Sequence, residues 1–125
     1  MEAFKEDFRK WYFKNHCKSN IRYKDLMPHH IMDIFGWFDA VDTAFQWGVY
    51  VDFFEEHDIY PDVIYCHGHA AFKIDSKEKY HAACSDKDAY HALIFTNSKK
   101  RARETAIKKA IKIYNSNHAK SNKDT

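Results

Sequence analysis

The chain has 125 residues, 45% of them hydrophobic, and a formal net charge of +2, which suits one folded domain and is too short for a large two-domain enzyme. Its three glycines cannot form the glycine-rich motifs of dinucleotide-binding folds, P-loop NTPases or nucleophile-elbow hydrolases. The amino-terminal segment MEAFKEDFRKWYFKNHCK is charged throughout, which is unlike a signal peptide. No apolar run is long enough to span a membrane. The chain has three cysteines, an odd number. We therefore expect a cytoplasmic protein with free thiols.

The first part of the chain predicts helices. Residues 2–15 repeat aromatic side chains at helical spacing, which indicates a helix with one face on the core. Pro28 fits the first turn of a helix that opens near Met27, and residues 31–38 are expected to be a short helix.

A further helix is predicted over residues 41–57, with an apolar stripe formed by Val41, Ala44, Phe45, Gly48, Val49 and Phe53. We expect this stripe to face the core. A glycine inside a helix costs about 1 kcal/mol relative to alanine, so we expect Gly48 to allow the helix to approach a sheet closely.

The second part of the chain predicts three strands and a helix. Residues 62–74 alternate between an apolar face, which includes Ile64 and Cys66, and a polar face, which includes Val63 and Tyr65. Short strands follow at 79–84 and 89–95, and the short turns between the strands favour antiparallel neighbours. The last helix is expected over 99–114, with Asn97 or Ser98 as its cap, an inner face of Ala106, Ile107, Ala110, Ile113 and Tyr114, and a stop at Asn115.

These elements define an α+β fold in the order α-α-β-β-β-α, in which amino-terminal helices and a carboxy-terminal helix pack on a three-stranded antiparallel meander. We expect a single domain over residues 1–115 and a polar, frayed tail over 116–125. The sequence is silent on the oligomeric state.

Charge is unevenly distributed along the chain. Residues 25–72 contain nine carboxylates and no lysine or arginine, whereas residues 97–125 contain nine lysines and arginines and two carboxylates. Either the basic ends fold back and neutralise the acidic middle, or the folded surface carries two patches of opposite sign that steer partners.

The acidic middle is the first candidate site. Asp52, Glu55 and Glu56 have the spacing that gathers carboxylates on one helix face, and such a face could occupy the basic groove in which another protein holds phosphates. The expected partner-binding residues are Asp39, Asp42, Asp52, Glu55, Glu56 and Asp58.

Two segments carry a family resemblance: QWGVYVDFFE at residues 46–55 and RETAIKKAIKIYN at 103–115. They resemble patterns in a loose family of small phage and prophage proteins of unassigned activity, whose carboxy-terminal part is similar to the so-called phage ABA-sandwich domain. The resemblance covers roughly residues 40–115 and departs at residues 56–58, where the family more often has a serine and a glycine.

What the resemblance implies is an accessory phage protein, for which counter-defence against the host is a common role. Together with the acidic middle, it predicts a non-catalytic protein without a cofactor, located in the cytoplasm of the host cell, that binds and inhibits a host component with a basic groove. Mimicry of nucleic acid is one way in which it could do so.

Nucleic-acid binding is the first alternative. The last helix carries exposed-face cations that could follow a phosphate backbone, namely Lys99, Lys100, Arg101, Lys108 and Lys112.

A small-ligand or zinc site is the second alternative. In the expected meander, one sheet face could hold a nucleotide through Tyr65, His67, His69, Tyr80 and His91. Zinc would require Cys66, His69, His81 and Cys84 to converge, although regular strand alternation puts Cys66 and His69 on opposite faces.

Overall fold

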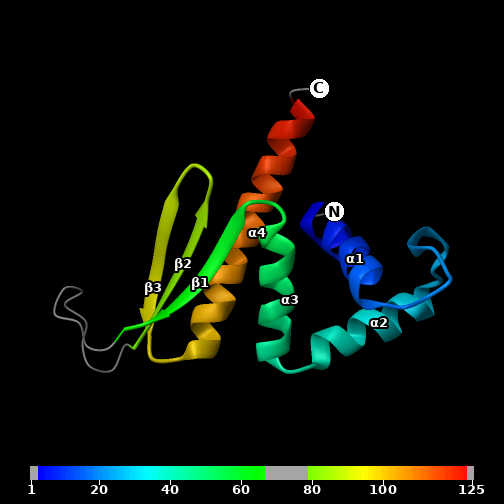
Figure 1. The fold of residues 1–125 in the computed structure, drawn as a ribbon, viewed down its shortest axis with the longest axis horizontal. Coiled ribbons are helices and arrows are strands. Elements are labelled where there is room, and N and C mark those ends of the chain that lie inside the picture. The colour runs from blue at the N-terminus through cyan, green and yellow to red at the C-terminus, as the bar shows by residue number, and fades with distance from the viewer. Residues whose placement is uncertain (1–2, 67–78, 124–125) are drawn as a thin grey trace. The chain divides into compact units, whose positions relative to one another are not determined.

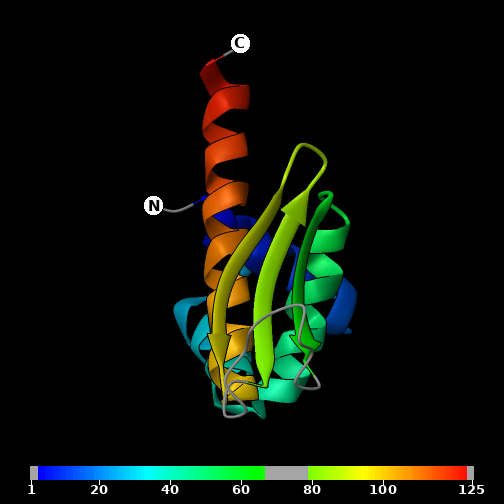
Figure 2. The ribbon, with the colours of Figure 1, turned by 90° about the vertical axis from the view of Figure 1, so that its left-hand side faces the viewer.

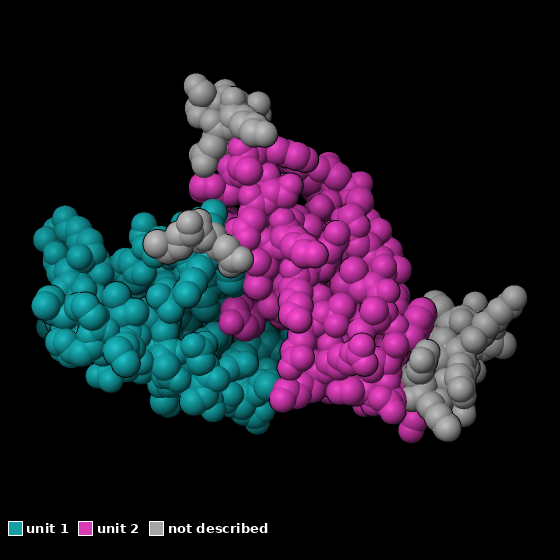
Figure 3. All heavy atoms as spheres, turned by 180° about the vertical axis from the view of Figure 1, so that it is seen from behind, with its two compact units in different colours: residues 1–49 teal, residues 50–125 magenta. Residues whose placement is uncertain are grey.

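The computed structural model describes residues 3–66 and 79–123. The chain divides into two compact units, residues 1–49 (unit 1) and residues 50–125 (unit 2), which Figure 3 shows in teal and magenta. The single domain expected over residues 1–115 stays a prediction.

Unit 1 is helical. It contains α1 (Ala3–His16), the short 3-10 helix η1 (Tyr23–Asp25), α2 (Pro28–Ala40) and the first half of α3 (Thr43–Glu55). The helices predicted in this part of the chain are confirmed, and Pro28 occupies the first turn of α2 after Met27, where its missing N–H costs no hydrogen bond.

Aromatic rings form the core of unit 1. Phe8 and Tyr12 of α1 contact Phe38 of α2 with ring centroids 5.5 and 5.0 Å apart. The guanidinium of Arg9 lies 4.9 Å above the ring of Phe35. Helices α1 and α2 are therefore held together by rings spaced at the helical period, as the sequence predicts.

The apolar stripe expected on α3 is partly wrong. Val49 and Phe53 are buried as predicted, but Ala44, Phe45 and Gly48 are exposed. A Cβ added to Gly48 would meet nothing within 4 Å, so no close approach to a sheet explains this glycine. Because α3 has apolar side chains nearly all round, its periodicity did not identify the buried face.

Unit 2 contains the end of α3, an antiparallel sheet and α4 (Lys99–Lys123). The strands are β1 (Ile59–Tyr65), β2 (Tyr80–Asp86) and β3 (Tyr90–Thr96), in the spatial order β1-β2-β3. Helix α4 packs on all three strands (Figure 1), so the predicted α+β class and the meander are confirmed.

The strand register decides which side chains face α4. Ile59 and Pro61 are buried, and Pro61 pairs with the fully buried Cys84 of β2. Ile64 points to the opposite face and is 39% exposed, so its assignment to the covered face is wrong. Strand β1 begins at Ile59, and its odd-numbered side chains are the ones that face α4. Val63 therefore takes the inner position that the sequence pattern assigned to Ile64.

The remainder of the long strand predicted over 62–74, and the turn at 75–78, lie outside the described residues. In Figure 2 the other face of the sheet is turned towards the viewer, and no described helix of unit 2 lies in front of it.

Helix α4 begins at the expected cap, since the Ser98 hydroxyl accepts a hydrogen bond from the backbone N–H of Arg101 at 3.2 Å. Its buried face includes four of the predicted residues together with Ala102, and Ile107 is half-buried. The stop predicted at Asn115 is wrong, because the helix continues to Lys123 and no glycine or proline follows Asn115 to end it. The polar tail expected over 116–125 is thus helical as far as Lys123.

None of the helices described for residues 3–66 and 79–123 combines the length and the apolar character that crossing a membrane requires.

Candidate functional site

Hydrogen bonds to backbone carbonyl groups stabilise the corner between α2 and α3. The Gln46 side-chain amide donates to the carbonyls of Phe38 (2.8 Å) and Asp39 (3.2 Å). The backbone N–H of Val41 donates to the carbonyl of Trp37 at 3.1 Å. These bonds satisfy carbonyls at the end of α2 and fix the direction in which α3 leaves it.

Asp39 and Asp42, the two predicted partner-binding residues of unit 1, lie at this corner and are exposed. The Asp42 carboxylate accepts a hydrogen bond from the backbone N–H of Ala44 at 3.1 Å, so it caps the start of α3. Asp42 therefore has a structural task in addition to any role in binding.

The other four predicted carboxylates lie in unit 2, at the end of α3 and in the turn that follows, and all are exposed: Asp52, Glu55, Glu56 and Asp58. The backbone N–H of Asp58 donates to the carbonyl of Glu55 at 3.2 Å, and Asp58 adopts a left-handed conformation with φ of 59°. This turn ends the helix and leads into β1.

Asp58 also acts on its neighbour in β1. The Tyr60 hydroxyl donates to the Asp58 carboxylate at 3.3 Å, and the negative charge of Asp58 is the main cause of a raised pKa for Tyr60. The phenol, which is protonated at neutral pH even at its ordinary pKa of 10.0, therefore remains a donor further into alkaline pH. Whether the acidic residues and the basic ends form separate patches on the folded surface stays a prediction.

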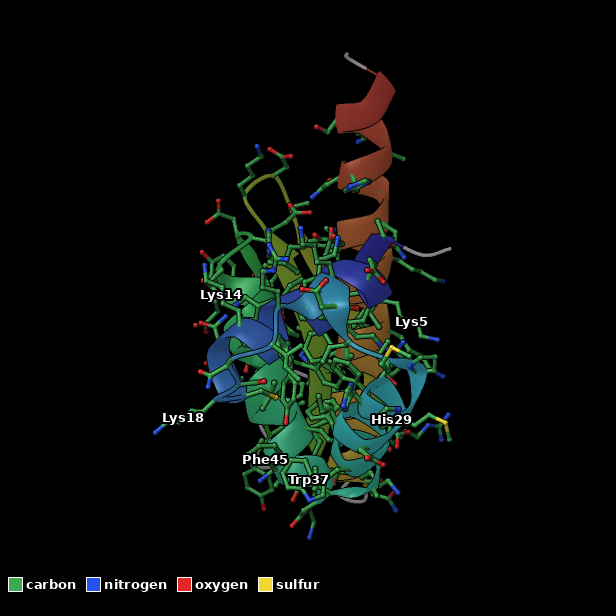
Figure 4. The ribbon with its side chains drawn as sticks, turned by 90° about the vertical axis from the view of Figure 1, so that its right-hand side faces the viewer. Lys5, Lys14, Lys18, His29, Trp37 and Phe45 are labelled. Carbon is green, nitrogen blue, oxygen red and sulfur yellow. The ribbon has the colours of Figure 1, made fainter. Side chains whose placement is uncertain are left out.

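The sequence missed an exposed aromatic pair at the α2–α3 corner. Trp37 is 56% exposed and Phe45 is 43% exposed, and their rings meet edge to face with centroids 5.8 Å apart. Figure 4 shows the two side chains next to each other at this corner. Sequence periodicity assigned Phe45 to the core, and no pattern singled out Trp37.

The cations of the nucleic-acid alternative are exposed on α4, including Lys99, Lys100, Arg101, Lys108 and Lys112. The last three lie opposite the buried alanines of the helix, as the helical period requires. They stand on one solvent-facing side of α4.

The described part of the predicted ligand face has the expected register. Tyr65 pairs with Tyr80, and Cys84 pairs with His91, so all four lie on one side of the sheet. This is the side on which α4 packs, and Cys84 at its centre is fully buried. Burial raises the pKa of the Cys84 thiol to about 11. His67 and His69 lie outside the described residues.

The zinc alternative is not supported by the positions of His81 and Cys84, which point to opposite faces of β2. His81 is buried against Phe95 of β3, with ring centroids 4.4 Å apart. Across residues 3–66 and 79–123, the structure brings together no group of three His, Cys, Asp or Glu side chains that could hold a metal ion.

A pocket of about 410 Å³ lies in unit 2 beside the β2–β3 turn. Its lining mixes charges, with Asp58, Asp86 and Asp88 beside Lys87 and Lys120. Asp86 is already engaged in the turn, because its carboxylate accepts hydrogen bonds from the backbone N–H groups of Asp88 (2.8 Å) and Ala89 (2.9 Å). These bonds lower the pKa of Asp86.

Comparison of this chain with protein-family models, curated proteins and solved structures finds no match. The phage resemblance of residues 46–55 and 103–115 therefore stays a prediction from the sequence.

Proposed function

We propose that this chain is a non-catalytic phage or prophage accessory protein that binds and inhibits a host component through carboxylates on its helical surface. The partner is a protein with a basic groove, such as one that holds nucleic acid. The observation that carries the proposal is the exposure of Asp52, Glu55 and Glu56 within a stretch, residues 25–72, that contains no lysine or arginine.

Helix geometry supports this choice. Asp52 and Glu55 are three residues apart on α3, and Glu56 follows at the start of the turn. Buried Phe53 and Phe54 anchor the same end of the helix, and Phe53 contacts Tyr114 of α4 with ring centroids 5.4 Å apart. The carboxylates are thus presented on a well-packed support, which limits the entropy lost when a partner binds.

The chemistry of the partner follows from electrostatics. Neighbouring carboxylates without intervening cations attract a surface rich in lysine and arginine, and they raise the association rate with it. A groove that normally holds phosphates is such a surface. The host and counter-defence part of the proposal rests on the resemblance of residues 46–55 and 103–115.

The test compares three forms of the full chain as baits in host lysate: the wild type, the charge reversal D52K/E55K/E56K, and the reversal of one exposed carboxylate on α4, E104K. We expect the wild type and E104K to capture the same basic protein, salt to release it, and the triple variant to lose it. Purified wild-type chain should then inhibit the activity of the captured protein on nucleic acid. Equal capture or inhibition by the triple variant would refute the proposal.

Nucleic-acid binding by α4 is the second candidate, because Arg101, Lys108 and Lys112 are exposed on one side of the helix. An anisotropy titration with labelled duplex DNA and RNA at about 50 mM salt tests it, since phosphate contacts are strongest at low salt. Binding that the variant K108E/K112E weakens supports this candidate, and the absence of binding rules it out.

A further inference from the structure

Trp37 and Phe45 form an exposed aromatic pair on unit 1. Single exposed rings are ordinary, but these two are in contact and belong to different helices, α2 and α3. Tryptophan is also among the residues that contribute most often to binding energy at protein interfaces.

The pair is rigidly supported. Phe45 contacts Phe38, whose ring is almost fully buried, with centroids 6.4 Å apart. Trp37 lies in the last turn of α2, where its carbonyl accepts a hydrogen bond from Val41. The bonds from Gln46 and the Asp42 cap hold the start of α3 against that turn. A site held in this way loses little conformational freedom on binding.

The surroundings of the pair favour a cation. Asp33 is exposed and stands four residues before Trp37 on α2, so the two side chains share a helix face, whereas Asp39, two residues after Trp37, projects from another side of the helix. All seven lysines and arginines of unit 1 precede residue 25. In Figure 4, the labelled Lys5, Lys14 and Lys18 lie apart from Trp37 and Phe45.

Arginine fits this site better than lysine. A guanidinium can lie flat on an indole ring and still donate hydrogen bonds to a carboxylate, whereas a lysine ammonium is a strongly hydrated point charge. Unit 1 already contains one such contact, between Arg9 and Phe35.

We propose that Trp37 and Phe45, with the carboxylate of Asp33 on the same face of α2, form an anchor site for an arginine side chain of a basic partner protein. This inference rests on the proposed function, because it assigns a binding hot spot to the partner that the carboxylates attract.

The test measures the binding of two labelled peptides of equal length and charge, one alternating glycine with arginine and the other glycine with lysine. The full chain is titrated at about 50 mM salt, where screening of surface charges is weak. We expect the arginine peptide to bind more tightly. The variant W37A/F45A should weaken its binding about tenfold or more and remove the preference over the lysine peptide.

Two further variants separate this role from folding and from apolar area. Y90A removes a ring that is 60% exposed in unit 2 and should leave both affinities unchanged. W37L keeps apolar area but has no π face, so it should lose the preference for arginine while retaining the thermal unfolding midpoint of the wild type.

Several results would overturn the anchor site: equal affinity for the two peptides, no binding of either, or unchanged binding of the arginine peptide by W37A/F45A. If D52K/E55K/E56K loses the peptide while W37A/F45A retains it, the anchor site is wrong and the proposed function stands. If neither variant changes the binding of peptide or of the captured protein, the two proposals fail together.

Discussion

The imidazole of His81 stacks on the ring of Phe95 across the β2–β3 pair, with centroids 4.4 Å apart and planes inclined by 15°. His81 is only 6% exposed, and in the described structure its Nε2 atom is buried and has no hydrogen-bond partner. The contact between the two rings stabilises the fold. The unpaired Nε2 atom destabilises it, because a buried polar atom without a hydrogen bond lowers stability.

Replacing His81 by phenylalanine should therefore stabilise the protein. The variant keeps the stacked ring and removes the unpaired nitrogen, and we expect the free energy of unfolding to rise by about 1 kcal/mol. Urea denaturation of the wild type and H81F measures this change. F95L serves as the control and should lower stability because it removes the stacking partner. A loss of stability in H81F would contradict this prediction.

Gly48 offers a second stabilising change. It lies inside α3, and a Cβ at this position meets no atom within 4 Å. The substitution G48A should raise the free energy of unfolding by up to about 1 kcal/mol, because alanine loses less backbone entropy in a helix. Gly36 of α2 has the same open surroundings, so G36A is a matched test. Thermal melts in which neither variant has a higher unfolding midpoint than the wild type would contradict this prediction.

Asp58 holds a left-handed conformation in the turn that follows α3, which an L-residue with a side chain adopts at a cost. D58G should stabilise the fold by about 1 kcal/mol at most, since glycine adopts this conformation freely but has more freedom in the unfolded chain. D58A provides the contrast and should destabilise it. Calorimetric midpoints in the order D58G, wild type, D58A from highest to lowest would agree with this geometry, whereas a lower midpoint for D58G would not.

Asp86 should make the stability depend on acid pH. The backbone N–H groups of Asp88 and Ala89, followed by His91 and Lys109, lower its pKa from the ordinary value of 3.8. The folded chain therefore binds this proton less readily than the unfolded chain, so the contribution is complete above pH 3.8 and is lost as the pH falls through the lowered pKa. D86N keeps an acceptor for the two N–H groups but removes the charge.

Urea denaturation of the wild type and D86N between pH 2 and pH 6 measures this contribution, over a range that spans the ordinary carboxyl pKa of about 4. The stability difference between the two proteins should shrink as the pH decreases. A difference that is constant with pH would show that the Asp86 carboxylate has its ordinary pKa in the folded protein.

The local pattern of residues determined which helices and strands this protein forms, although not all of their ends. Ring spacing identified α1, Pro28 and Ser98 marked the starts of α2 and α4, and the short turn after Asp86 indicated antiparallel strands. These signals are local, because a helix or a tight turn depends on residues only a few positions apart. For the same reason the six acidic positions were visible in the sequence as a charge pattern, although their role stays a prediction.

Only the tertiary structure decided which faces are buried. Nothing in the alternation of residues 62–74 shows that Ile59 and Pro61 meet α4, and so that Ile64 points outward. Because α3 has apolar residues on nearly all sides, the sequence likewise did not indicate that Phe45 is exposed and contacts Trp37. Burial depends on partners that are distant in the sequence, and when a segment is apolar on several sides its own periodicity cannot select among them.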